Sequence, residues 1–396
     1  MRNYSDWLAA FMDYASFGEA PPYMYKWVGI STIAGALRRR VRLNMGYFEW
    51  TPNFYVIIVA PPGIVSKSTT AGIGMELLRE VPGIRFGPDV VTWQMLSQTL
   101  AESCEEYLDE EGMFHKMTAL TIESSEFGNL FNPHDREMVD FYITLWDGKR
   151  GKLQKATKTS GSDVIINPWV NLIACTTPAW IAGNFPEYMI GGGFTSRCVF
   201  VYAAEKHKYV AYPGLVMPTS ILETKRKLIA DLEQISMLQG DYTIHPDAVE
   251  WGENWYIQHY ANRPAHLNNE RFGGYIARKQ THMHKLAMVL SAARRGDLTL
   301  TVSDLDEANN ELSALEEMMP KVFEQIGKSE DSRIADEVIS IIRGLGTPTY
   351  QEAFNHCFRL VPDVDQFNDL LKSLQAASRL GMIPGPNNSV RLQVQR

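Results

Sequence analysis

The chain has 396 residues, of which 45% are hydrophobic and 21% charged, and its formal net charge is −8. These values indicate a soluble globular protein of two or three domains, and the acidic balance argues against wholesale coating of nucleic acid. No apolar run approaches the ~18–20 residues that a membrane span needs, and Asp6 and Asp13 interrupt any apolar core of a signal peptide. The four cysteines are scattered, without metal spacing or disulfide density, so we expect reduced thiols in a cytoplasm.

The N-terminal region, residues 1–45, is predicted to be helical. Apolar residues recur at helical spacing around Trp7 and Phe11, and a second helix is expected over about 23–40. The run that follows alternates Arg40 and Arg42 with Val41 and Leu43, which is typical of a half-exposed strand.

Residues 46–220 are predicted to form the core of the chain. Four β-like runs, at 54–60, 117–122, 170–175 and 198–202, alternate with helical segments. Strands that alternate with helices predict a mainly parallel sheet inside a three-layer α/β fold. Residues 221–328 read as entirely helical, a lid domain. Residues 329–396 give three helices followed by a β-hairpin, the order of a winged helix.

The run from 55 to 70 has the layout of a P-loop, because a β run turns through Pro62 and Gly63 and delivers Lys67 to the start of a helix. Backbone N–H groups would cradle the phosphates of ATP, the lysine would reach their oxygens, and the next hydroxyl would hold Mg²⁺. The predicted nucleotide-binding residues are Pro62, Gly63, Ser66, Lys67, Ser68 and Thr69. Ala60 and Ser66 replace the usual glycines, and a serine where φ is positive would be strained by roughly 1 kcal/mol. The alternative is a strand–turn–helix whose lysine is a solvated surface residue.

Hydrolysis on such a sheet needs a carboxylate at the end of a neighbouring strand. Glu123 and Glu126 follow the β run at 117–122. We favour Glu126 as the base that orients water, with Glu123 joining Ser68 in the magnesium shell. The alternative is that both carboxylates cap the following helix, where negative charge is favourable.

Three further residues are candidates for sensing the nucleotide. Thr177 follows the third β run and could sense the γ-phosphate, although Thr-Thr-Pro is also common turn chemistry. Arg197 follows three glycines and could act across a subunit boundary as an arginine finger, or form a strand-edge ion pair. Arg278 shares a helical face with His282 and Lys285, which fits either a lid aimed at the nucleotide or a solvated basic face.

The segment 148–162 is a basic island in an acidic chain. It carries Lys149, Arg150, Lys152, Lys155 and Lys158, with no acidic residue among them. Point charges among glycines and hydroxyls suit contact with a phosphate backbone without base readout, so we expect this loop to contact DNA. The third helix of the last region begins with Asp363, Asp365 and Asp369, which would repel phosphates, so a protein partner is expected there.

Taken together, residues 21–40 and 53–70, the segment after Ser125, the segment after Thr177 and the Gly-rich run before Arg197 resemble a family of uncharacterised P-loop proteins. That family occurs in phage and prophage replication modules and in the helicase-like halves of primase–helicase fusions, and the resemblance covers residues 5–325. Its order of elements is similar to that of AAA+ motors of the minichromosome-maintenance and superfamily 3 type, which have a DNA-contacting hairpin before the sensor strand. The resemblance implies Lys67 and Ser68 for phosphate and magnesium, Glu126 for water, Thr177 as sensor and Arg197 as finger.

The prediction is therefore a hexameric ring ATPase that engages DNA, single-stranded DNA in the first place, as a replicative helicase of a phage or mobile element. Residues 329–396 would dock a replication partner. The alternative is a nucleotide-dependent assembly or helicase-loader protein with little hydrolysis, which the atypical P-loop and a serine, Ser125, at the usual aspartate position favour. A small-molecule kinase would need a lid of arginines near an acceptor site, which the sequence does not offer.

Overall fold

The computed structural model describes residues 2–109, 112–157, 161–324, 326, 330–385 and 390–395. The chain divides into two compact units, Met1–Ile326 and Gly327–Arg396. The division falls beside the predicted start of the last region at 329. The three regions predicted over 1–328 lie together in the first unit.

A mixed sheet forms the centre of the first unit. Among the described residues it has five strands in the order β4-β5-β8-β3-β9. All neighbours pair in parallel except β4, which runs antiparallel to β5. The strands are β3 (Tyr55–Val59), β4 (Cys104–Leu108), β5 (Phe114–Ser124), β8 (Pro168–Thr176) and β9 (Cys198–Tyr202). The predicted α/β class is confirmed.

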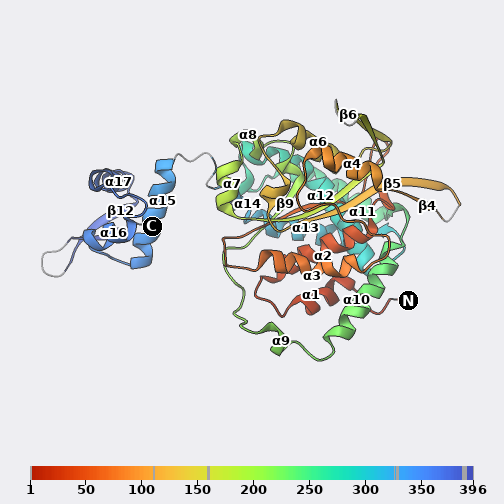
Figure 1. The fold of residues 1–396 in the computed structure, drawn as a ribbon, viewed down its shortest axis with the longest axis horizontal. Helices are drawn as coiled ribbons and strands as arrows, with labels where there is room; N and C mark the ends of the chain where they lie inside the picture. Colours follow the sequence, from red (N-terminus) through yellow and green to blue (C-terminus); the bar gives the residue numbers. More distant parts are fainter. Residues whose placement is uncertain are drawn as a thin grey trace. The chain divides into compact units, whose positions relative to one another are not determined.

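Helices cover both faces of this sheet (Figure 1). Val56 and Ile58 point into one apolar cluster, whereas Tyr55, Ile57 and Val59 point into another, so the strand residues are buried on both sides. The first cluster is packed by α1 (Trp7–Ala15), α2 (Pro22–Leu37), α3 (Lys67–Arg79), α10 (Ile221–Ser236), α12 (Gly273–Arg294) and α13 (Val302–Glu316). The second is packed by α4 (Trp93–Glu102), α5 (Phe127–Leu130), α6 (Arg136–Asp147), α7 (Pro178–Asn184), α8 (Glu187–Ile190) and α14 (Met319–Phe323). This arrangement is compatible with a three-layer α/β fold.

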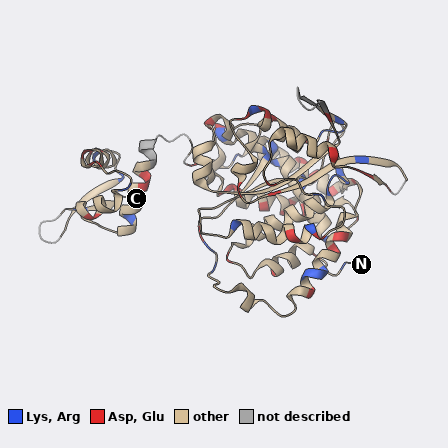
Figure 2. Cartoon of the chain, in the orientation of Figure 1, with Lys and Arg blue, Asp and Glu red and all other residues tan. Residues whose placement is uncertain are grey.

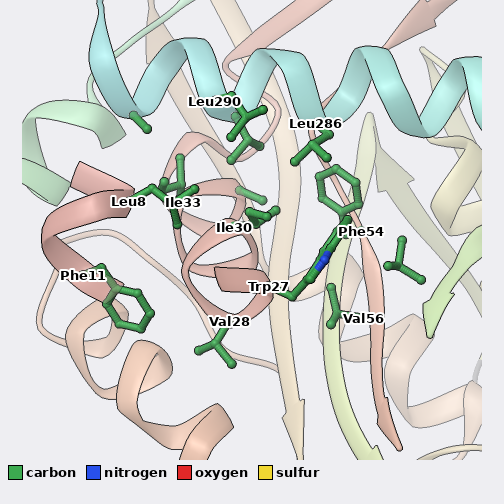
Figure 3. Packing of buried hydrophobic residues seen from close by; sticks show 14 of the residues in the cluster. Leu8, Phe11, Trp27, Val28, Ile30, Ile33, Phe54, Val56, Leu286 and Leu290 are labelled. Carbon is green, nitrogen blue, oxygen red and sulfur yellow. The ribbon is translucent and has the colours of Figure 1, made fainter. Parts of the chain in front are cut away.

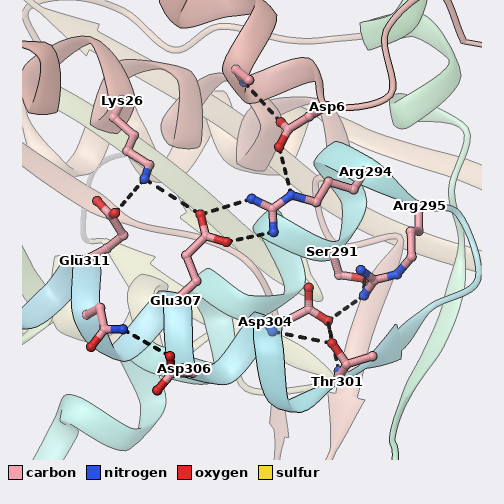
Figure 4. A network of polar contacts seen from close by, with 12 residues as sticks. Asp6, Lys26, Ser291, Arg294, Arg295, Thr301, Asp304, Asp306, Glu307 and Glu311 are labelled. Atoms are coloured by element: carbon pink, nitrogen blue, oxygen red, sulfur yellow. Dashed lines mark hydrogen bonds and ion pairs between the residues drawn. The ribbon is translucent and has the colours of Figure 1, made fainter.

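The N-terminal helices belong to the core of the first unit. Trp27 of α2 meets Phe54 edge-on, with ring centroids 6.1 Å apart, and Leu286 and Leu290 of α12 belong to the same cluster (Figure 3). A polar network adds to this packing (Figure 4). In it Arg294 pairs with Asp6 at 2.8 Å and with Glu307 at 2.7 Å.

A smaller sheet has the strand order β11-β10-β1-β2. It contains β1 (Val41–Asn44), β2 (Glu49–Trp50), β10 (Gly240–Ile244) and β11 (Thr299–Leu300). The alternation at 40–43 does form a strand, with Val41 and Leu43 buried. The prediction that 221–328 is entirely helical is wrong, because β10 pairs in parallel with β1 and β11 with β10. These strands form by pairing with segments that are distant in sequence. The helix α9 (Pro213–Val216) precedes this region, which also contains α11 (Pro246–Ala261) and short 3₁₀ turns at Ala265–Leu267 and Glu270–Phe272.

The basic segment forms a β-hairpin of β6 (Lys152–Thr157) and β7 (Gly161–Ile166). Asn167 ties its base to the sheet: its side-chain amide donates to the Lys116 carbonyl at 2.7 Å and its Oδ1 accepts from the Gly151 N–H at 2.7 Å. The hairpin leads directly into β8.

The described residues of the second unit form three helices and then an antiparallel hairpin, in the predicted order. The elements are α15 (Glu330–Leu345), α16 (Tyr350–Cys357), α17 (Val364–Ala376), β12 (Leu380–Pro384) and β13 (Val390–Val394). Val338, Ile342, Phe367 and Leu392 lie in its own buried cluster. Within the described ranges of the whole chain, no helix has the length and apolar character needed to cross a bilayer.

Candidate functional site

The carboxyl ends of β3, β5 and β8 meet at one edge of the central sheet. Val59 of β3 is paired with Thr176 of β8, and Ser124 of β5 is paired with Ala174 of the same strand. Side chains that directly follow these strands are therefore neighbours, and such an edge is where open α/β sheets bind ligands. Lys67, Glu126 and Thr177 all follow strands that end here.

The loop between β3 and α3 needs a positive φ at one position. Gly63 has φ +72°, and no described atom lies within 4 Å of the place where its Cβ would be. Ser66 has φ −75° and ψ 70°, an ordinary backbone conformation. The predicted strain at this serine is therefore wrong, because the chain places the left-handed residue three positions earlier.

The start of α3 is open to solvent. Ser66 stands at the N-cap and, within the described part of the chain, its side chain makes no capping hydrogen bond. The exposed residues around this helix end are Pro62, Gly63, Ser66, Ser68 and Thr69. The first N–H groups of a helix lack intrahelical acceptors and carry partial positive charge, so they suit an anion.

Lys67 is the first residue of α3 and is half-buried. Its ammonium donates to the carbonyl oxygens of Ala60 at 2.9 Å and Pro61 at 3.4 Å, which holds the charge over the loop. The alternative of a lysine free in solvent is not what the structure shows. These residues fit a bound phosphate group.

Glu123 lies on the α3 side of the sheet, close to the middle of that helix. Its Oε2 accepts a hydrogen bond from Arg79 at 3.0 Å, and a Cβ at Gly72 would lie 3.8 Å from its Oε1. Burial raises the pKa of Glu123, and the charge of Arg79 opposes that rise only in part. Gly72 is one helical turn beyond Ser68, so the carboxylate is one turn from the hydroxyl predicted to share a metal with it.

Glu126 is exposed and stands at the N-cap position of α5. Among the described residues its side chain accepts no capping hydrogen bond, whereas its backbone carbonyl accepts one from the Ser124 hydroxyl at 2.9 Å. Neither Glu123 nor Glu126 is used as a helix cap. The carboxylate of Glu126 is therefore free of a capping role and available to a ligand or a water molecule.

Cys175 lies on β8, paired with Ile58 close to the end of β3. The pKa of this thiol is raised to about 12, chiefly by burial; the charge of Lys67 opposes the rise and those of Glu123 and Glu126 add to it.

Thr177 is the N-cap of α7, and its hydroxyl accepts a hydrogen bond from the Trp180 N–H at 3.1 Å. The residue therefore has the turn role that its sequence also predicted. A hydroxyl that accepts still has its own proton to donate, so this cap and a phosphate contact are compatible.

Arg197 lies at the opposite end of the strands, where β3 and β9 begin. It closes the 3₁₀ turn Thr195–Arg197 just before β9, whose first residue is paired with Tyr55 at the start of β3. The length of β3 separates this edge from the loop by about 13 Å. Asp147 binds the guanidinium in a bidentate pair at 2.7 and 2.8 Å, and the Gly193 carbonyl accepts at 2.6 Å.

The side chain of Arg197 is 7% exposed. An arginine finger must be free to enter a neighbouring site, so this placement argues against the predicted finger. A Cβ at Gly193 would lie 3.0 Å from Ile143 Cδ1 and 3.3 Å from Arg197 Nη1, so the glycine leaves room for the guanidinium.

Arg278 lies near the same pair. Burial lowers its pKa, the charge of Arg197 lowers it further, and Asp147 opposes this. The predicted aim at the nucleotide edge is therefore not supported. The solvated basic face is also wrong, because His282 and Lys285 on this helix are buried. Lys285 binds Asn53 Oδ1 at 2.8 Å and lies 3.6 Å from the Trp146 ring centroid, and burial holds its pKa well below the usual value.

The predicted DNA-binding residues that the structure describes lie at this end of the strands too. Lys149, Arg150 and Lys152 are exposed and have no ion-pair partner among the described residues. Lys155 is in β6, but its side chain lies outside the described residues, as does the whole of Lys158. Figure 2 shows basic residues on the hairpin and on β5, where the single lysine, Lys116, is paired with Glu106 at 2.5 Å.

Arg38 and Arg39 do not add to this basic surface, because both are buried. Arg38 pairs with Glu105 at 2.9 Å, and burial lowers its pKa to about 10. Arg39 pairs with Glu49 and donates to the Pro168 carbonyl at 3.0 Å. They hold elements together instead of meeting a ligand.

Sequence reasoning missed the partners of its own candidates. Arg79 lies two helical turns beyond Gly72 on the same face of α3, a spacing that could have drawn attention to it. Asp147 ends α6 immediately before the basic segment, but nothing in the local pattern links it to Arg197 fifty residues later.

A scan against protein-family models and a search of curated proteins give no match to this chain. The described residues also contain no group of three or more His, Cys, Asp or Glu side chains arranged to hold a metal ion. Magnesium with a nucleotide keeps several waters and phosphate oxygens and takes one or two protein oxygens. Ser68 of α3 and Glu123 of β5, whose carboxylate lies beside Gly72 one turn beyond Ser68, fit that smaller demand.

Proposed function

We propose that this chain binds ATP with Mg²⁺ at the edge where β3, β5 and β8 end, as a P-loop ATPase of the AAA+ type. The observation that supports this most is that β3, β5 and β8 end together, so that Lys67 at the start of α3 and Glu126 at the start of α5 follow strands of the same sheet end. An ammonium at a helix N-terminus after β3, with carboxylates at the end of β5 on the other side of β8, supplies the positioning and charge stabilisation that phosphoryl transfer needs.

Each residue has a distinct task in this proposal. Lys67 leaves the carbonyl oxygens of the loop and binds phosphate oxygens. The free N–H groups in the first turn of α3 bind the same phosphate. Bound Mg²⁺ would supply charge neutralisation between the β- and γ-phosphates, held through Ser68 and Glu123. Glu126, which is exposed, orients the attacking water, and the Thr177 hydroxyl donates a hydrogen bond to the γ-phosphate.

The proposed activity is that of a hexameric motor that moves single-stranded DNA, as in a phage or mobile-element helicase. The hairpin of β6 and β7 carries Lys152 and follows Lys149 and Arg150, so it offers unpaired cations to a phosphate backbone. The hairpin also leads into β8, which ends beside the proposed nucleotide site. The winged-helix-like second unit, with its acidic α17, would dock a partner protein.

A nucleotide-dependent loader is the second candidate, and one observation favours it. The arginine predicted to complete a neighbour's site is held by Asp147. A ring that lacks such an arginine would bind ATP and assemble, but hydrolyse it slowly.

The two candidates are separated by steady-state ATP hydrolysis with and without single-stranded DNA. For a motor we expect hydrolysis that DNA stimulates, that Lys67→Ala abolishes, and that loses its stimulation in Lys152→Glu with Lys155→Glu. Assembly on ATP with little hydrolysis, unchanged by DNA, would favour the loader. Failure of ATP to bind the wild-type chain would refute both.

A further inference from the structure

The turn between β1 and β2 presents two aromatic rings to solvent. Tyr47 is fully exposed and Phe48 is 53% exposed. Gly46 has φ +81° and allows the tight turn, which the hydrogen bond from the Met45 N–H to the Phe48 carbonyl closes at 2.8 Å. The rings are therefore displayed by a short, defined hairpin.

Behind the turn, further aromatic side chains hold this surface in place. The Phe48 and Trp50 ring centroids are 5.4 Å apart, and Trp50 meets the buried His284 at 4.9 Å. Phe48 is thus supported from the core of the first unit, while its outer face remains open.

The turn and the basic segment line one cavity of about 410 Å³. Tyr47 and Phe48 line one part of it, and Lys149 and Arg150 line another. This volume lies within the range of small-molecule and nucleotide pockets. Residues a hundred positions apart in sequence thus bring aromatic rings and cations together.

The cavity also contains two carboxylates, but both are neutralised from within. Glu49 pairs with the buried Arg39, and Asp147 pairs with the buried Arg197. Lys149 and Arg150 have no ion-pair partner among the described residues. The charge left to a ligand is therefore positive.

We propose that this cavity binds a nucleotide of single-stranded nucleic acid, whose base stacks on Tyr47 or Phe48 while its phosphates meet Lys149 and Arg150. Stacking platforms beside a cationic track are how proteins hold single strands without base readout. An apolar protein partner would not use the unpaired cations, so the charge favours nucleic acid. This inference rests on the proposed engagement of single-stranded DNA and adds the surface that contacts the bases.

The test is the fluorescence anisotropy of a labelled oligothymidylate and of an abasic strand of the same length, with full-length protein. We expect Tyr47→Ala with Phe48→Ala to weaken oligothymidylate binding by about 5- to 100-fold. The abasic strand should bind the wild type more weakly and be unaffected by the substitutions. Tyr47→Phe should bind as the wild type does, and Tyr212→Ala, at a tyrosine 71% exposed elsewhere, should change nothing.

The other outcomes each overturn the inference. Equal loss for both strands would mean that the rings do not meet bases. Full binding by Tyr47→Leu with Phe48→Leu would indicate an apolar contact of the kind made with a protein. If the wild type binds DNA and the alanine variant binds it equally well, only this inference fails. If the wild type binds neither strand, the proposed DNA engagement fails with it.

Discussion

Replacing Arg197 with alanine is expected to destabilise the first unit instead of removing a catalytic group from a neighbour. The substitution leaves Asp147 without its bidentate partner and the Gly193 carbonyl without its donor. Breaking a buried pair costs about 3–5 kcal/mol, but Asp147 is 32% exposed and can recover some hydration, so we expect about 2–4 kcal/mol. At about 2.1 cal/mol/K per residue, unfolding Met1–Ile326 has an entropy near 0.7 kcal/mol/K, which gives a fall in Tm of about 3–6 °C.

The assay is thermal unfolding of Arg197→Ala beside Arg226→Ala, which removes an exposed arginine from α10 and should change stability by less than about 0.5 kcal/mol. The same proteins are then tested for ATP hydrolysis below their unfolding temperatures. An unchanged Tm with hydrolysis reduced about a thousandfold would refute our reasoning. So would recovery of hydrolysis when Arg197→Ala is mixed with Lys67→Ala, because each would then complete the other's site.

Three further results are expected. First, Glu123→Gln should weaken MgATP binding yet stabilise the free protein at neutral pH. Burial raises the pKa of this carboxyl, so its favourable contribution to the free energy of unfolding is present at acidic pH and is lost as pH rises through the folded-state pKa. Wild type and variant should therefore be equally stable at acidic pH. A difference in stability there, or a less stable variant at pH 7, would contradict this. Second, MgATP at about 100 times its Kd should raise Tm by about 4 °C, an effect that EDTA or Lys67→Ala removes; an equal shift in that variant would place ATP elsewhere. Third, Lys152→Ala should reduce the salt dependence of single-strand binding by about 0.7 in slope, whereas Lys227→Ala on α10 should not; equal slopes would exclude a phosphate contact at the hairpin.

The alternation of strands and helices was readable because each strand is buried on both faces and therefore appears as a short apolar run. The same logic failed for β10, whose residues are mostly polar or half-exposed and become a strand only through β1, two hundred positions away. Pairing with so distant a partner leaves little local pattern. The strands of the hairpin were missed for another reason: the basic residues that indicated a loop lie in and just before β6.

The candidate site was predictable where the chain itself connects the residues. Lys67 follows β3 and Glu126 follows β5, and parallel strands deliver both to one edge. Arg197 was misplaced because the glycines before it indicate a turn but not which end of the sheet the turn occupies. The order of strands settles that question, since Arg197 precedes β9 whereas the other candidates follow their strands. Its partner Asp147 is a contact between distant segments, which only the folded structure reveals.

β8 joins the two functional edges, and its environment limits how they can communicate. Its nine residues are all buried, and it pairs with β3 on one side and β5 on the other. Asn171 fixes it further, since its Oδ1 accepts from the Phe54 N–H and its amide donates to the Ser31 carbonyl of α2. A strand held in this way cannot slide along its neighbours without breaking the ladder on both sides. In the proposed ring, nucleotide turnover would therefore move the hairpin only together with the central sheet, and the movement would take place between copies of the chain.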